Sequence, residues 1–128
     1  MKEPGSTLES GPWTRHVLDV FGDPNEVGEG AGHHVVCADF DGDGDDEFLV
    51  ALRGPRPWQG VFYYKCVDLE KALFVKQRVS WSSAARITVA DFDGDGRPDF
   101  ATTGYYTPGY FLAENPQVLV FLNRTGDA

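Results

Sequence analysis

An internal repeat constrains this 128-residue chain more than any other feature of its sequence. The segment Ala-Asp-Phe-Asp-Gly-Asp-Gly-Asp-Asp-Glu-Phe at 38–48 recurs, 52 residues further on, as Ala-Asp-Phe-Asp-Gly-Asp-Gly-Arg-Pro-Asp-Phe at 90–100. Short apolar segments flank both copies. A period of about 50 residues with short apolar segments is typical of β-propeller blades and related arrays, in which each unit is one supersecondary structure.

Short segments rich in Val, Tyr, Phe and Thr, bounded by Gly, Pro and Asp, predict strands and almost no helix. The predicted strands are residues 13–20, 33–38, 47–53, 60–67, 73–80, 84–90, 99–106 and 117–123. Leu69, Ala72 and Leu73 have helical spacing. We nevertheless expect a turn and then a strand there, because residues 74–79 lie where the fourth strand of a blade belongs.

The strand count predicts an all-β chain with four strands per repeat. We expect one domain over residues 1–128, a partial β-propeller of about two four-stranded antiparallel blades. The first repeat covers about 33–80, the second covers about 84–123 without its last strand, and residues 1–12 form a flexible N-terminus. Propellers close with four to eight blades, so such a chain belongs to a longer propeller or pairs with other copies. A compact β-sandwich is the alternative.

The acidic centre of each repeat has the pattern Asp-x-Asp-x-Asp-Gly-x-x-(Asp/Glu), with acids at relative positions 1, 3, 5 and 9. Carboxylates at alternate positions of a tight turn point into one hollow, and their repulsion favours a hard cation, Ca²⁺ before Mg²⁺. Asp45 and Arg97, at position 7, are expected to contribute only their backbone carbonyls. An EF-hand is excluded because Val50 and Thr102 stand at position 12, where that loop needs Glu. A solvated turn is the alternative, but two matched copies favour metal binding.

This motif, at a period near 50 and entered by an apolar strand ending in Ala-Asp, resembles the FG-GAP/VCBS-type repeats of integrin-α-like β-propellers. In that family the hairpin loop between the first and second strands binds Ca²⁺. The resemblance covers residues 33–53 and 85–106 and implies a Ca²⁺-stabilised scaffold or binding module with two sites. The implied ligands are Asp39, Asp41, Asp43 and Glu47 in one loop, and Asp91, Asp93, Asp95 and Asp99 in the other. Glu47 departs from the usual Asp.

A second, narrower resemblance rests on three other segments. Trp13-Thr-Arg-His16, Gly32-His33-His34 and the aromatic segment 58–64 are similar to the propeller domain of fungal aldos-2-ulose dehydratase/isomerase enzymes. Those long chains, with propeller and cupin domains, eliminate water from sugar-derived ketoses using zinc. The resemblance implies an alternative function, as a fragment of a zinc-dependent carbohydrate lyase.

His33 and His34 are the candidate zinc ligands under that alternative. Adjacent side chains on a regular strand point to opposite faces, so only one of the two is expected to face a given site. Ala85 and Arg86 stand at the matching positions of the second repeat. The pair therefore lies outside the repeated framework, although packing is the simpler interpretation. No catalytic residue is assigned.

Other polar and aromatic candidates have simpler structural interpretations. Glu26 and Glu29 have the chemistry of a general base or a further ligand, but a solvated loop explains them. The ring residues are expected to pack between blades rather than to stack on a sugar; they are Trp58, Tyr63, Tyr64, Tyr105, Tyr106 and Tyr110. Cys37 and Cys66 lie in apolar runs and are expected to behave as small hydrophobic residues.

The net charge of −9 is local to the two acidic segments, which hold half of the 20 acidic residues; the other half is balanced by 11 Lys and Arg. No basic patch for nucleic acid is present. The longest uncharged run, 100–113, is broken by Gly and Pro, and the first 12 residues lack the apolar core of a signal peptide. The sequence therefore predicts no membrane partner and favours an intracellular location. Expected partners are further blades, other copies or, in the lyase alternative, a carbohydrate.

Overall fold

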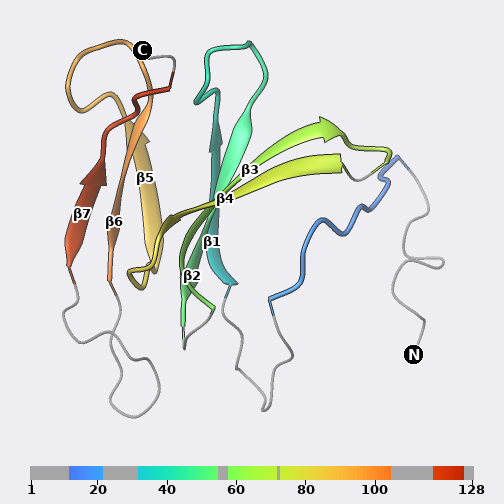
Figure 1. The fold of residues 1–128 in the computed structure, drawn as a ribbon, viewed down its shortest axis with the longest axis horizontal. Helices are drawn as coiled ribbons and strands as arrows, with labels where there is room; N and C mark the ends of the chain where they lie inside the picture. The colour runs from blue at the N-terminus through green and yellow to red at the C-terminus, as the bar shows by residue number, and fades with distance from the viewer. Residues whose placement is uncertain (1–11, 22–31, 55–57, 72, 105–116, 126–128) are drawn as a thin grey trace.

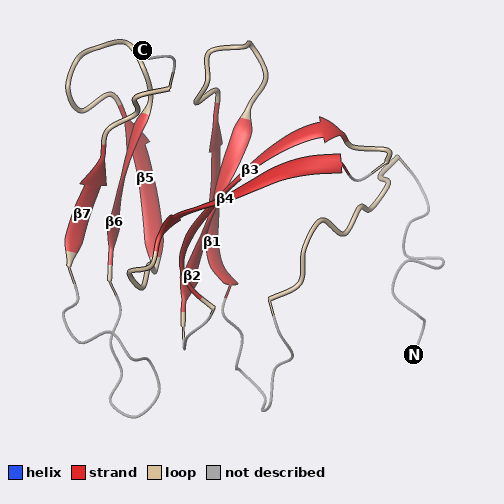
Figure 2. Ribbon diagram, in the orientation of Figure 1, coloured by secondary structure: helices blue, strands red, loops and turns tan. Residues whose placement is uncertain are grey.

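The computed structural model describes residues 12–21, 32–54, 58–71, 73–104 and 117–125. Over these ranges the chain forms two antiparallel sheets and no helix (Figures 1 and 2), which confirms the all-β prediction. The described ranges contain no helix with the length and apolarity needed to cross a membrane.

The first sheet has four strands in sequence order, joined by hairpins. They are β1 (Gly32–Ala38), β2 (Glu47–Arg53), β3 (Gln59–Asp68) and β4 (Leu73–Ser80). The predicted strands 47–53 and 73–80 coincide with β2 and β4. A turn precedes β4, so the helical spacing of Leu69 and Leu73 does not produce a helix.

The second sheet has three strands within the described residues, in the order β5 (Arg86–Ala90), β6 (Asp99–Thr103) and β7 (Val118–Phe121). Its register repeats that of the first sheet, because Val89 pairs with Phe100 just as Cys37 pairs with Phe48. The sequence repeat is therefore a structural repeat at its first two strands. Residues 105–116, including part of the predicted strand 99–106 and Tyr105, Tyr106 and Tyr110, lie outside the described residues.

One core lies between the two sheets. Leu49, Ala51 and Val61 of the first sheet pack with Ile87 and Phe100 of the second. Burial of each large side chain of this kind contributes about 2 kcal/mol. The first strands of the two sheets, β1 and β5, lie against one another. The structure thus shows packed antiparallel sheets of four and three strands; their interpretation as propeller blades, rather than a sandwich, stays a prediction.

The opposite face of the first sheet carries a second cluster, covered in part by residues 12–21. Leu52, Phe62 and Tyr64 form its buried centre. The Phe21 ring stacks on that of Phe62, with 5.9 Å between their centroids. The Tyr64 hydroxyl donates a 2.7 Å hydrogen bond to Asp19. Side chains therefore attach this segment to the sheet.

The predicted strand at 13–20 is wrong, because the described segment 12–21 has no strand pairing. A segment with the composition of a strand becomes one only when its backbone groups pair with those of a neighbouring strand. This segment instead contacts the face of the first sheet through Asp19 and Phe21. Of the expected flexible N-terminus, only Pro12 is within the described residues.

Candidate metal centres

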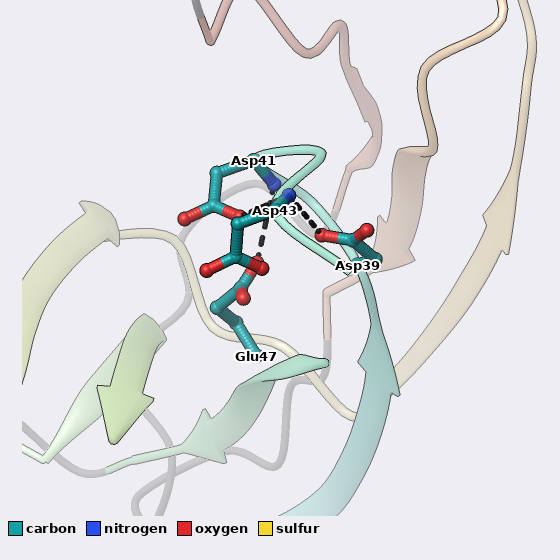
Figure 3. A group of neighbouring side chains, drawn as sticks. All are labelled: Asp39, Asp41, Asp43 and Glu47. Carbon is teal, nitrogen blue, oxygen red and sulfur yellow. Dashed lines mark hydrogen bonds between the residues drawn. The ribbon is translucent and has the colours of Figure 1, made fainter. Parts of the chain in front are cut away.

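Each acidic loop closes the first hairpin of its sheet. Asp39 follows β1 and Glu47 begins β2; Asp91 follows β5 and Asp99 begins β6. In each loop, one oxygen from each of four carboxylates lies within 4.8 Å of the other three. The groups are Asp39, Asp41, Asp43 and Glu47, shown in Figure 3, and Asp91, Asp93, Asp95 and Asp99. The structure therefore gathers the acids at positions 1, 3, 5 and 9 into one group of four in each loop.

The acid at position 1 holds the turn in shape. The Asp39 carboxylate accepts backbone N–H bonds from Gly42, Asp43 and Gly44, at 2.9, 3.1 and 2.8 Å. Asp91 accepts the matching bonds from Gly94, Asp95 and Gly96, at 2.8, 3.2 and 2.8 Å. Both glycines of each loop have positive φ, for example +77° at Gly42 and +93° at Gly44, which other residues rarely adopt. The backbone of each turn thus holds the position-1 carboxylate in a fixed orientation.

The acid at position 9 is buried in both loops. Glu47 and Asp99 are each 1% exposed. Oε1 of Glu47 accepts the N–H groups of Phe40 and Asp41, at 2.9 and 3.1 Å. Burial nevertheless raises the pKa of Glu47, with a further contribution from the negative charge of Asp41. A buried carboxylate is costly unless it is compensated, and these two backbone N–H groups supply part of that compensation.

Asp99 satisfies its carboxylate differently. Its Oδ2 accepts the Phe92 N–H at 2.8 Å, which matches the Phe40–Glu47 bond of the first loop. Its Oδ1 accepts the Asn123 N–H at 2.7 Å. The extra methylene of Glu47 is therefore accommodated without loss of the shared bond.

Asn123 connects the two loops. Its Nδ2 donates to the carbonyl of Phe40 in the first loop at 2.6 Å and to that of Pro98 in the second at 3.0 Å. A single side-chain amide therefore holds the two candidate centres in fixed relation. This role of Asn123 could not be predicted from the sequence, because the contact joins two distant segments.

Basic side chains compensate part of the acidic charge. The Lys65 ammonium contacts Asp41 Oδ2 and lies 2.7 Å from Asp43 Oδ2. This lysine, helped by the Asp45 N–H, lowers the pKa of Asp43 to about 2. In the second loop, Arg124 Nη1 lies 3.1 Å from Asp93 Oδ2. The sequence analysis did not identify Lys65 or Arg124 as partners of the acidic loops. The available signal for Lys65 was that it is the one charged residue in the predicted strand 60–67.

The residues at position 7 lie outside the two carboxylate groups. Their backbone N–H groups donate to the position-5 acids, since Asp45 donates to Asp43 and Arg97 donates to Asp95, both at 2.9 Å. The Arg97 side chain also bonds Asp95 Oδ2 and the Thr125 carbonyl. That Asp45 and Arg97 supply carbonyl ligands stays a prediction.

The two histidines join the sheets. His33 Nδ1 lies 2.5 Å from the Ala85 carbonyl, and His34 Nδ1 accepts the Ile87 N–H at 3.1 Å. The pairing of β1 with β2 shifts between Gly32 and His34. Both imidazoles reach residues 85–87, contrary to the expectation that adjacent residues serve opposite faces. Neither belongs to a metal-ligand group among the described residues.

A cavity of about 420 Å³ lies between the sheets beside the second loop. Phe40, Tyr63 and Phe121 line it, with Gln77 and Arg124 among its polar groups. Tyr63 also packs against the inter-sheet core, while Trp58 and Tyr64 belong to the cluster on the opposite face. Tyr63 thus packs between the two sheets, whereas Trp58 and Tyr64 pack on the other face of the first sheet. The preference for packing between blades over stacking on a sugar stays a prediction. Glu26 and Glu29 lie outside the described residues. Cys37 and Cys66 are free and exposed, so they do not behave as the small buried hydrophobic residues that the sequence predicted.

Fold and loops together define a class, an all-β repeat protein whose hairpins carry clustered carboxylates. No protein-family profile matches the chain. One curated protein is similar in sequence: the chain is 52% identical over 116 residues to aldos-2-ulose dehydratase from Phanerodontia chrysosporium. The match covers 87% of this chain but spans only 13% of the length of that protein. The comparison supports the narrower resemblance, to a segment of a fungal dehydratase; the FG-GAP/VCBS resemblance stays a prediction.

Proposed function

We propose that this chain corresponds to one segment of a carbohydrate dehydratase (a lyase), in which it supplies a cation-stabilised framework. The observation that carries the proposal is the 52% identity to aldos-2-ulose dehydratase over 87% of the chain. Identity at this level over nearly the whole chain indicates common descent of the segment. The corresponding reaction is the removal of water from an aldos-2-ulose, a sugar with adjacent aldehyde and keto groups.

The framework role follows from the two carboxylate groups. Each offers an oxygen-only donor set from four acids, which is the chemistry that Ca²⁺ prefers, with Mg²⁺ second. The residues fit the ion, because the acids are held by backbone N–H groups and one acid of each group is buried. A bound Ca²⁺ would supply charge compensation, and the loops would hold the ends of the hairpins together. We therefore propose a structural calcium site in each loop.

The described residues do not fit a catalytic zinc centre. Such centres use three protein ligands and an open position, and no third ligand joins His33 and His34 among the described residues. Both Nδ1 atoms are also engaged with residues 85–87. No step of the reaction is therefore assigned to this pair. The proposed site for a carbohydrate is the cavity between the sheets, which is lined by aromatic side chains and has a volume that suits a small ligand.

A segment exchange tests the proposal. Replacing the matched 116 residues of the Phanerodontia chrysosporium enzyme with those of this chain should give a folded dehydratase, because the two segments share 52% identity. Formation of the dehydrated product from an aldos-2-ulose is the readout. The control is a chimera whose second loop carries Asp91→Ala, which should lose stability. A chimera that is stable, binds calcium and has no dehydratase activity would contradict the proposed correspondence.

A further inference from the structure

We infer that Lys65 is a tethered counter-cation of the first acidic loop, which a divalent ion must displace from two of its ligands in order to bind. The lysine thereby weakens the affinity of this loop for Ca²⁺ and stabilises the loop when Ca²⁺ is absent. The inference rests on the proposed cation role of the loops and adds a regulator of that role.

The oxygens that Lys65 contacts are those the loop itself leaves available. Oδ1 of Asp41 accepts the Asp43 N–H at 3.2 Å, and Oδ1 of Asp43 accepts the Asp45 N–H at 2.9 Å. The Lys65 ammonium bonds the other oxygen, Oδ2, of each carboxylate. A Ca²⁺ ion bound by these two acids would compete for the same oxygens. Repulsion between a dication and an ammonium a few ångströms away strengthens the competition.

The strand register places the lysine at the loop. Tyr64 of β3 pairs with Phe48 of β2, so Lys65 lies one residue further along, on the side where Glu47 begins β2. Lys65 is also paired in the ladder with Val75 of β4. The base of the side chain is therefore fixed by two neighbouring strands, while the side chain remains 32% exposed. An ammonium on such a stem can withdraw into solvent when a stronger cation arrives.

The second loop repeats the arrangement with a weaker contact. Arg124 Nη1 lies 3.1 Å from Asp93 Oδ2 and 3.7 Å from Asp95 Oδ2, at positions 3 and 5 again. Its side chain is 57% exposed, compared with 32% for Lys65. A basic side chain, from within β3 in the first sheet and from the segment after β7 in the second, therefore meets the acids at positions 3 and 5 in both repeats. The greater exposure of Arg124 predicts a smaller effect there, because solvent screens the pair.

Calcium titration by calorimetry tests the inference. The first loop is isolated in an Asp91→Ala background, and Lys65→Gln is compared with Lys65→Arg and Lys71→Gln. Lys71 is an exposed lysine of the β3–β4 turn, so its variant removes one charge away from the loops. We expect Lys65→Gln to bind Ca²⁺ about three- to tenfold more tightly, or roughly 0.7 to 1.4 kcal/mol. Lys65→Arg and Lys71→Gln should change the affinity less than about twofold.

Thermal unfolding in EGTA supplies the second readout. Without Ca²⁺, Lys65→Gln should unfold at a lower temperature than the parent, because Asp41 and Asp43 lose their counter-charge; Lys71→Gln should not. Folded Lys65→Gln protein with unchanged or weaker Ca²⁺ binding would overturn the inference alone. Absence of Ca²⁺ binding in every variant and in the unsubstituted chain would overturn the proposed metal role and the inference with it. Binding gained only on Lys65→Gln would support the inference.

Discussion

The two acidic loops share their backbone and differ in how their charge is compensated. In both, the position-1 aspartate accepts the same three N–H groups, and the position-9 acid accepts the N–H seven residues earlier. The first loop then uses a lysine from β3, whereas the second uses Arg97 and Arg124. The turn geometry is therefore the repeated part, while the basic partners come from less similar parts of the two repeats.

Removal of Ca²⁺ is the largest test of what the loops share. If each binds Ca²⁺, chelation should lower the free energy of unfolding by about 2.7 kcal/mol per loop when the parent is held at a hundredfold excess over Kd. Chemical unfolding with Ca²⁺ and with EGTA measures the difference. Asp39→Ala and Asp91→Ala should each remove about half of it. Equal stability with and without the chelator would show that neither loop uses a cation structurally.

Neutralising the position-9 acids should reveal a smaller difference in the free energy of unfolding between the two loops. Oε1 of Glu47 accepts both N–H groups of its loop, so the amide oxygen of Glu47→Gln can replace it. In Asp99→Asn, one amide NH₂ must face a backbone N–H, because two different oxygens accept the Phe92 and Asn123 groups. In EGTA we expect Asp99→Asn to cost about 1–3 kcal/mol and Glu47→Gln less than about 1 kcal/mol. Urea unfolding measures both, and a reversed order would refute this account of the second loop.

Lowering the pH should give the smallest difference in stability between the parent and its variants. The lysine contact, with the Asp45 N–H, lowers the pKa of Asp43 to about 2. Because the folded value lies below the unfolded one, Asp43 adds stability above pH 4, which is lost as the pH falls toward 2. In Lys65→Gln this loss should shrink. The pKa of Asp95 is lowered first by the Arg97 backbone N–H, so Arg124→Gln should leave the acid profile nearly unchanged. Circular dichroism from pH 6 to 2 in EGTA compares the variants.

Local patterns accounted for the parts of the molecule that depend on neighbouring residues. The spacing of Asp39, Asp41 and Asp43 is sufficient to predict a shared hollow, because a tight Gly-containing turn brings alternate side chains together. The bounds of β2 and β4 follow from short apolar-rich segments that lie between turn residues.

Features that depend on pairing between distant segments could not be predicted from the sequence. The segment 13–20 has the composition of a strand but contacts the first sheet through side chains instead of pairing with an edge strand. The shift in β1 pairing has no local signal, and neither do the contacts of His33 and His34 with residues 85–87. Lys65 acts on Asp41 only because β3 returns beside β2. These roles depend on register, which one sequence does not specify for each pair.

The Asn123 contact has a consequence for the order in which the chain matures during synthesis. The four strands of the first sheet are complete at Ser80, and their pairing needs no later residue. The bond from Asn123 to the Phe40 carbonyl joins residues 83 apart, and such distant contacts form late because a long loop must close first. The first sheet can therefore form while the ribosome is still adding the second. The link between the two loops waits until almost the entire 128-residue segment has left the exit tunnel.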